Sequence, residues 1–239
     1  MHGTEIQSLT GEEMGRSVYK FLHSRDVGSM MSGNVVIRPL SYYRRLEEQG
    51  AAPWIGDRLE NISEVYVDHV SDKTPELLNR IGPEGMPPGL SPMDGAKDWS
   101  ASDVTFQYQF ANDPWVFCAS DGDLKELTKV MCGGDSNYDA CVRIKDFGKF
   151  TAHLYFQGRI KLNPVADFFK ASHAGRVKYD HVALKIQEGR PPVPGPFLKD
   201  VKFLSQQEGR YALFPSNPIG EDILFINFSS ASEHLVQEF

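Results

Sequence analysis

The sequence predicts an α+β fold with a mainly antiparallel, split β-sheet core and short helices. About eight segments have the composition of strands, and most of them follow one another in the second half of the chain. No helix candidate long enough for a parallel crossover separates them, which disfavours a doubly wound fold. An all-β protein with helical decorations is the competing class. We expect one domain over residues 1–239.

The first half of the chain predicts an alternation of strands and short helices. Ser24 suits the N-cap of the first helix, Gly33 suits the position after its end, and Ser41 suits the N-cap of the second. Residues 52–64 read as an irregular loop, and residues 82–98 hold so many prolines and glycines that a loop or mobile insertion is predicted. The strand candidates are SVYKFLH, NVVIRPL and EVYVDHV, and the helix candidates are RDVGSMMS and SYYRRLEEQ.

The second half is rich in strand candidates. DGDLKELTKVMCGG has apolar residues at helical spacing and ends in two glycines, so it predicts a helix. GKFTAHLYFQGRI and PVADFFKAS are ambiguous, with a helix slightly favoured for the second. The strand candidates are DVTFQYQFA, PWVFCAS, YDACVRIKD, GRVKYDHVALKIQ, RYALF and DILFINF.

Composition and charge exclude several classes of protein. The chain is 41% hydrophobic and 11% aromatic, as in globular proteins, and its net charge of −7 gives no footprint for general binding to duplex DNA. A local basic groove for single strands or a nucleotide stays open. The apolar runs are far shorter than the ~20 residues of a membrane span, and the N-terminus lacks the pattern of a signal peptide, so we expect a cytoplasmic protein without membrane contact.

Common catalytic and metal-binding motifs are missing from the sequence. There is no GxGxxG, Walker, GxSxG, HExxH or kinase signature. Cys118, Cys132 and Cys141 have neither CxxC spacing nor a histidine at metal-ligand spacing, so we expect reduced thiols and no metal site. What remains is a set of polar residues at the ends of strand candidates.

Arg38 ends one such strand, where a guanidinium can hold a pyrophosphate or a carboxylate with two hydrogen bonds. A surface arginine at a strand end is the alternative. The segment that follows it combines aromatic rings with charges of both signs, which fits a ligand site as well as it fits a solvated helix packed by its tyrosines. Its candidate binding residues are Tyr42, Tyr43, Arg44, Asp57 and Arg58.

Ser120 and Glu208 stand at the ends of two later strand candidates. The Ser120 hydroxyl can order a carboxylate or a ribose, or it can cap the helix that begins near Asp121. An ionised Glu208 can bind a ribose hydroxyl and stabilise positive charge on an anomeric carbon, although solvated glutamates are common. Gln206 would share its face in an extended segment and hold a second substrate.

The order of these segments resembles a broad set of bacterial proteins with a Tyr-Arg-Tyr-like first strand and an Asn-Asp-Pro-Phe-Glu-like loop. The matching segments here are VYKFL, NVVIRPLSYYRRLE, GDRLE, FCAS, YDACVRI and KFLSQQEGR. That layout is similar to the ADP-ribosyltransferase fold, and the similarity spans roughly residues 17–228. FCAS replaces a Ser-Thr-Ser motif, and GDRLE replaces the Asn-Asp-Pro-Phe-Glu loop.

The resemblance implies an NAD-dependent ADP-ribosyltransferase-like enzyme that transfers ADP-ribose to a protein or nucleic acid, with a toxin or phage-defence effector as the expected role. It implies that Arg38 contacts the dinucleotide and that Tyr19 lies in the cofactor cleft. Ser120 would support the nicotinamide ribose, Glu208 would be catalytic, and Gln206 would help to choose the acceptor. The alternatives are a non-catalytic interaction protein of phage–host conflict on the same scaffold and a nucleotide hydrolase.

Overall fold

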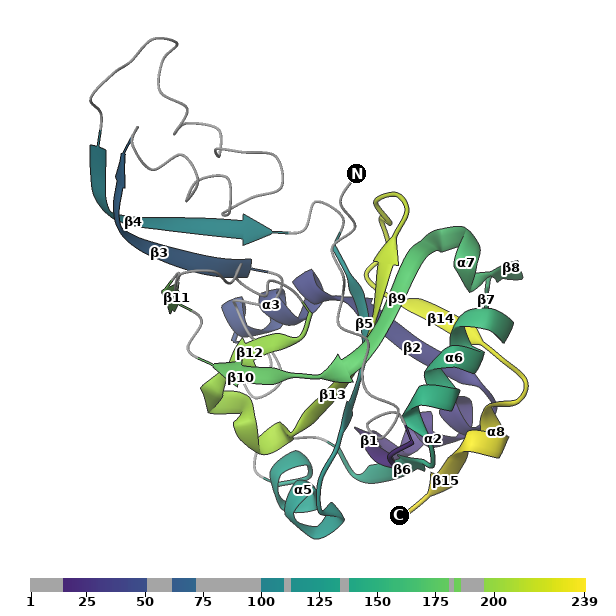
Figure 1. The fold of residues 1–239 in the computed structure, drawn as a ribbon. Helices are drawn as coiled ribbons and strands as arrows, with labels where there is room; N and C mark the ends of the chain where they lie inside the picture. Colours follow the sequence, from purple (N-terminus) through teal and green to yellow (C-terminus); the bar gives the residue numbers. More distant parts are fainter. Residues whose placement is uncertain are drawn as a thin grey trace.

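Strand β5, Trp115–Ser120, is the element around which the main sheet is organised (Figure 1). Along one edge it pairs with β13, Glu208–Pro215. On the other edge its first residues pair with β2, Asn34–Pro39, and its last residue pairs with β1, Val18–Leu22. Two different strands therefore leave the same edge of β5, and the sheet divides into two branches.

The computed structural model describes residues 15–50, 62–71, 100–109, 113–133, 138–180, 183–185 and 196–239. All the helices in these parts of the chain are short. They are α2 (Ser24–Met31), α3 (Leu40–Glu48), α5 (Leu124–Met131), α6 (Phe147–Gln157), α7 (Val165–Phe168), α8 (Ala231–His234) and the 3-10 helix η1 (Val201–Gln206). No described helix has the length and apolar character needed to cross a membrane.

The two branches of the main sheet are antiparallel. One runs from β1 to β6 (Ala140–Ile144) and β15 (Leu235–Gln237), and the other runs from β2 to β14 (Leu224–Asn227), β7 (Arg159–Ile160) and β8 (Asn163–Pro164). Beyond β13 lies β9, Phe169–Arg176. Two smaller sheets contain parallel pairs. In one, β10 (Lys178–Asp180) pairs with β12 (Leu198–Asp200). In the other, β3 (Ile62–Ser71) pairs in parallel with β11 (Ala183–Lys185) and antiparallel with β4 (Ser100–Gln109).

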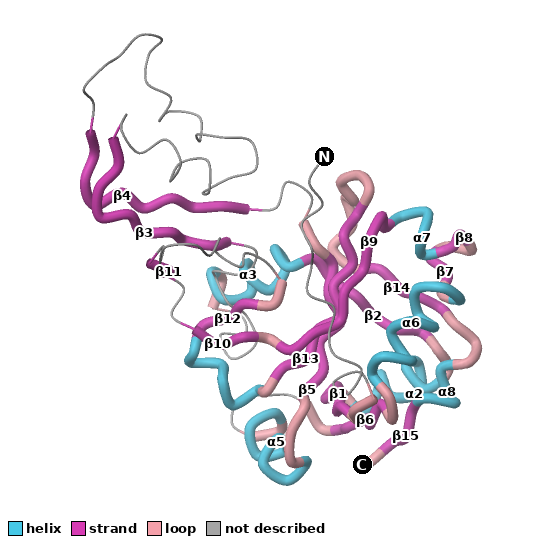
Figure 2. The backbone as a smooth tube through the Cα atoms, viewed as in Figure 1, coloured by secondary structure: helices cyan, strands magenta, loops and turns pink. Residues whose placement is uncertain are grey.

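The main hydrophobic core covers one face of β5. Because side chains alternate along a strand, Phe117 and Ala119 point to this core, whereas Cys118 and Ser120 point to the opposite face. Phe117 lies 5.6 Å from Phe150 of α6, ring centroid to centroid, and Phe150 lies 5.5 Å from Phe228. The tube view shows α2, α6 and α8 gathered together at this side of the sheet (Figure 2).

The opposite face of β5 is covered by α3, η1 and the strand pair β10–β12. Phe203 of η1 is buried with its ring centroid 4.6 Å from Lys199 Nζ of β12, and Tyr43 of α3 packs in one cluster with Cys118 and Val116. These elements come from distant parts of the chain and enclose a pocket with both polar and apolar lining, which contains the candidate site.

The structure confirms the α+β class, the mostly antiparallel sheet and the short helices. The first ambiguous segment contains helix α6, which Asp146 caps by accepting a hydrogen bond from Lys149 N. The second holds the short helix α7 and then the start of β9. The single strand expected over GRVKYDHVALKIQ is instead divided among β9, β10 and β11. Residues 82–98 lie outside the described residues.

Both predicted N-cap serines are wrong, and the reason is the same for each. Ser24 is the first residue of α2, and its backbone N and its hydroxyl donate to Asp139 over 2.6 and 2.8 Å. Ser41 lies inside α3, and its backbone N donates to Asp113 over 3.0 Å. An aspartate distant in sequence therefore satisfies each helix start. Gly33 has φ +96°, as expected after the end of α2.

Candidate functional site

One lateral row of three strands forms the floor of the candidate site. Ser120 of β5 is paired with Tyr19 of β1 on one side and with Glu208 of β13 on the other. Directly paired residues of antiparallel strands present their side chains on the same face. The row therefore brings together three residues from the beginning, the middle and the end of the chain.

These residues line a cavity of about 60 Å³. At roughly 10–15 Å³ for each water molecule, this space accommodates a few waters or a group of a few heavy atoms. Charged and polar side chains line one part of it, while Tyr19, Tyr43, Tyr138 and Met131 contribute aromatic and apolar surface. The cavity thus combines flat rings with groups that can hold a charge.

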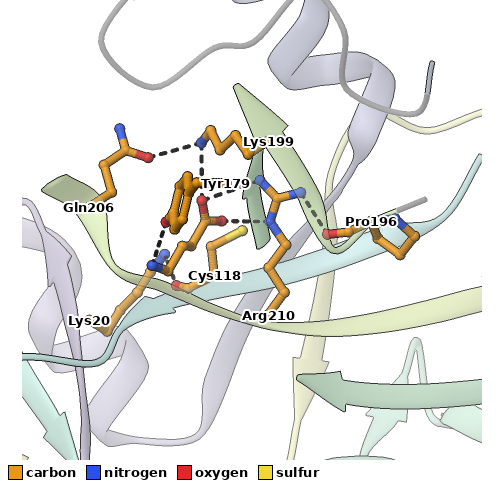
Figure 3. A network of polar contacts seen from close by, with 8 residues as sticks. Lys20, Cys118, Tyr179, Pro196, Lys199, Gln206 and Arg210 are labelled. Atoms are coloured by element: carbon orange, nitrogen blue, oxygen red, sulfur yellow. Dashed lines mark hydrogen bonds and ion pairs between the residues drawn. The ribbon is translucent and has the colours of Figure 1, made fainter. Parts of the chain in front are cut away.

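A buried ionic network surrounds Glu208 (Figure 3). Arg210 Nε lies 2.7 Å from Glu208 Oε1, and Arg210 Nη2 lies 3.2 Å from Oε2. Lys199 Nζ of β12 lies 3.0 Å from the same Oε2 and donates to Gln206 Oε1 over 2.9 Å. All four side chains are buried. Both oxygens of the Glu208 carboxylate therefore already accept hydrogen bonds from cations.

The network keeps Glu208 ionised. Burial alone would raise the pKa of Glu208, but the charges of Arg210 and Lys199, with hydrogen bonds from Arg210 and the Cys118 thiol, hold that pKa well below its ordinary value. Burial and the nearby Glu208 charge raise the pKa of Cys118 to about 12, so this cysteine is a neutral thiol at neutral pH. Glu208 is thus a fixed negative charge, and Cys118 is a poor nucleophile.

Tyr43 and Tyr138 line the pocket, and Tyr179 lies next to it. Glu208 N donates to Tyr179 Oη over 2.6 Å, which fixes the backbone at the start of β13. Burial raises the pKa of Tyr43 and Tyr179, and it raises the pKa of Tyr138 to about 12. These three phenols are therefore neutral and act as hydrogen-bond donors or acceptors.

A left-handed residue at the end of η1 sets the direction in which Glu208 enters the site. Gln207 has φ 43°, and its carbonyl accepts a hydrogen bond of 2.7 Å from Asp121 N. A Cβ on Gly122 would lie 2.5 Å from Gln207 Oε1, so the β5–α5 loop approaches this turn closely. Asp121 is also held by ion pairs with Arg16 and Arg176. The turn and the loop thus fix the ends of β5 and β13 against each other.

Five of the candidate residues from the sequence meet at the pocket: Tyr19, Tyr43, Ser120, Gln206 and Glu208. Ser120 is not a helix cap, because Asp123 accepts the hydrogen bonds at the start of α5. Gln206 ends a 3-10 helix instead of lying in the extended segment that was expected. It is nevertheless brought to Glu208 through their shared partner Lys199.

The other candidate residues are elsewhere. Arg38 shares the sheet face of Ser120 but pairs with Val116, at the far end of β5. Its guanidinium lies 4.0 Å from the ring centroid of Tyr42 and donates to Asp222 O over 3.3 Å. Of the described residues that line the cavity, none is Arg38, Tyr42 or Arg44. Asp57 and Arg58 lie outside the described residues.

Sequence reasoning missed several residues of the site: Lys20, Cys118, Tyr138, Tyr179, Lys199 and Arg210. Arg210 had a usable signal, since residues two apart in a strand share a face and Glu208 precedes it by two. Lys199 and Tyr179 had none, because they come from a separate strand pair that crosses the site.

No family model, curated protein or solved structure matches this chain. In the parts of the chain that the structure describes, no three His, Cys, Asp or Glu side chains gather in a way that could hold a metal ion. The chemistry of the site therefore has to be argued from its own geometry.

Proposed function

We propose that this protein is an NAD-dependent ADP-ribosyltransferase-like enzyme that works at the pocket beside Glu208. The observation that supports the proposal most directly is the row formed by Tyr19, Ser120 and Glu208 on three neighbouring strands. The resemblance found in the sequence implies that Tyr19 lies in the cofactor cleft, that Ser120 supports the nicotinamide ribose and that Glu208 is catalytic. Their meeting at one pocket is what such a site requires.

Each residue has a role that its surroundings permit. Glu208 stays ionised, so it stabilises positive charge that develops on the anomeric carbon as the bond to nicotinamide breaks. The Ser120 hydroxyl holds a ribose hydroxyl. Gln206, oriented by Lys199, faces the acceptor. Because the cavity is small, it takes only a part of the dinucleotide, and the remainder lies over neighbouring surface. The acceptor is a macromolecule, and a toxin or phage-defence role follows from the resemblance.

The experiment measures nicotinamide release and labelled product after incubation with NAD and a cell lysate. Ser120→Ala should lower the rate about tenfold, the value of one hydrogen bond to the reacting sugar. Ser29→Ala, on the exposed side of α2, is the matched control and should leave the rate unchanged. The rate of Glu208→Gln is measured together with its melting temperature, because this substitution also disturbs the ionic network and a loss of folding has to be told apart from a loss of activity. If the wild-type protein releases no nicotinamide, the proposal is lost.

A non-catalytic interaction protein on the same scaffold is the second candidate. The observation that favours it is the saturation of the Glu208 carboxylate by Arg210 and Lys199, which suits a structural charge. This candidate predicts that NAD is either not bound or is bound without turnover. A nucleotide hydrolase is less well supported, because it needs a general base and the lowered pKa of Glu208 makes it a weak one.

A further inference from the structure

Glu208 is poorly placed to take a proton from an acceptor. Both oxygens of its carboxylate are bound by cations, with Arg210 Nε 2.7 Å from Oε1 and Lys199 Nζ 3.0 Å from Oε2. Burial alone would raise the pKa of Glu208, but the charges of Arg210 and Lys199 hold that pKa well below its ordinary value, so the carboxylate is a very weak base. Of the described residues that line the pocket, none is a histidine, and Glu208 is the one carboxylate.

Other titratable groups of the pocket are also unsuited to act as a base. Burial raises the pKa of Tyr43, and it raises the pKa of Tyr138 and of Cys118 to about 12, so these three groups keep their protons at neutral pH. The ammonium of Lys20 is directed to the main core, since its Nζ lies 5.1 Å from the ring centroid of Phe117. Among the described residues, a nucleophile that reacts in this pocket therefore finds no base and has to arrive already deprotonated.

Lys199 decides which way the amide of Gln206 faces. An ammonium group has three donors and no acceptor, so the amide oxygen has to face it, and Oε1 accepts from Lys199 Nζ over 2.9 Å. The amide nitrogen of Gln206 then points away from Lys199 (Figure 3). Because this nitrogen carries two hydrogens, Gln206 presents donors, not acceptors, to a group that enters the pocket beside it.

The charges of the network also favour an anion at this place. Lys199 and Arg210 bring two positive charges to the single negative charge of Glu208, and all three side chains are buried. Charges interact more strongly there than at the surface, because the local dielectric constant is lower. A guanidinium acceptor would meet like charge, and since it has only donors it could not accept a hydrogen bond from Gln206.

We propose that the acceptor of ADP-ribose is a protein carboxylate, the side chain of an aspartate or a glutamate, and that Gln206 donates a hydrogen bond to it. Such a carboxylate is ionised at neutral pH, so it attacks without a base. One of its oxygens forms a bond to the anomeric carbon while the bond from that carbon to the nicotinamide nitrogen breaks. The electron pair of the broken bond stays on that nitrogen, so nicotinamide leaves as a neutral molecule. No proton moves, and the product is an ester.

This inference rests on the proposed function and names its acceptor, so the test examines the linkage that is formed. The full chain is incubated with NAD labelled in its adenylate part and a nuclease-treated cell lysate, and the labelled protein is treated with hydroxylamine at neutral pH. Hydroxylamine cleaves an ester rapidly, cleaves the bond to a guanidinium slowly and leaves the bond to an amide nitrogen intact. We expect rapid release of most of the label, and slow or absent release overturns the inference.

The pH dependence of transfer gives a second readout. Aspartate and glutamate carboxylates are fully ionised by about pH 7, so the rate of transfer should change less than about twofold between about pH 7 and about pH 9. A hydroxyl, thiol or guanidinium acceptor has to lose a proton, so its rate would rise with pH across this range. A rate that rises about tenfold for each pH unit contradicts a carboxylate acceptor.

Gln206→Glu tests the contact with the acceptor. Lys199 keeps an oxygen to bind, but a negative charge replaces the donors of the amide nitrogen, so transfer to protein should fall about tenfold or more. The Michaelis constant for NAD should stay unchanged, because Gln206 contacts the acceptor. Gln237→Glu, the same change at an exposed position of β15, is the matched control and should transfer as the wild type does. Transfer at the wild-type rate by Gln206→Glu would overturn the contact.

The outcomes separate this inference from the transferase activity itself. If neither free nicotinamide nor labelled product appears, the proposed function fails and the inference fails with it. Labelled protein that resists hydroxylamine removes the inference alone, and so does label that is found in nucleic acid when the nuclease is omitted. If Gln206→Glu does not fold, the hydroxylamine treatment of protein labelled by the wild type decides.

Discussion

Glu208 and Arg210, two residues apart on β13, form a buried ion pair in which Arg210 Nε lies 2.7 Å from Glu208 Oε1. Their side chains are only 7% and 1% exposed, so both charges are largely removed from bulk water. Lys199 joins the same carboxylate. Removing the Glu208 charge leaves two buried cations without their carboxylate partner. This lowers the free energy of unfolding far more than the loss of a surface ion pair does.

Glu208→Gln should therefore destabilise the protein by about 3 kcal/mol, measured as the free energy of unfolding in urea. The matched control is Glu126→Gln, which removes another glutamate of an ion pair, with Lys129, on the exposed side of α5. That change should have little measurable effect. If both substitutions lowered the free energy of unfolding by the same amount, the network around Glu208 would contribute no more to stability than a surface ion pair does.

A histidine pair with one buried member, His234, and one half-buried member, His153, makes stability depend on pH. His153 Nδ1 of α6 lies 2.8 Å from His234 Nε2 at the end of α8, and burial together with the His153 charge lowers the pKa of His234. In the unfolded chain a histidine titrates near pH 6.5, so the unfolded state takes up more protons as the pH falls below that value. Stability should be complete above about pH 6.5 and decrease toward about pH 5.

The measurement is the melting temperature between about pH 8 and about pH 5, where Glu208, with its lowered pKa, stays ionised. His234→Gln should flatten the dependence. Burial also lowers the pKa of His173, so His173→Gln is measured separately to tell the two contributions apart. An unchanged slope in His234→Gln would rule out the pair as the cause.

Two glycines in and after α2 give opposite predictions for the same substitution. Gly33 has φ +96°, and an added Cβ would lie 2.2 Å from Phe228 O, so Gly33→Ala should destabilise the protein by about 2 kcal/mol or more. Gly28 lies inside the helix with nothing within 4 Å of an added Cβ. Gly28→Ala should therefore stabilise it by about 0.5–1 kcal/mol. Urea unfolding of both variants shows whether the free energy of unfolding falls or rises. Destabilisation by Gly28→Ala would contradict an open helical position for Gly28 in α2.

Short-range patterns predicted most of the described strands, and long-range contacts account for what they missed. Short apolar runs located β5, β6, β13 and β14, because each of these strands buries one or both of its faces. The sequence could not show that Asp139 and Asp113 begin α2 and α3, since each lies in a different part of the chain from the helix that it caps. Ser24 and Ser41 were predicted as N-caps because they are the residues of capping type nearest to the two expected helix starts.

The candidate site was predicted in part for the same reason. Ser120 and Glu208 could be predicted because each is a polar residue at the end of an apolar strand candidate. Lys199 reaches Glu208 only because η1 reverses the chain after β12 and Gln207 takes a left-handed conformation before β13. Lys20 lies within a strand candidate and gave no signal of its own, and only the fold shows that this residue belongs to the lining of the pocket.

The place of β5 between strands of very different sequence position has a consequence for the growing chain on the ribosome. When β1, β2 and β5 have been synthesised, one edge of β5 can already be paired, but its other edge must wait for β13. Until then β5 has unpaired backbone groups, and neither Glu208 nor Arg210 exists to complete the pocket. The pocket is thus incomplete until late in translation, and the free edge of β5 is open to mispairing during that wait.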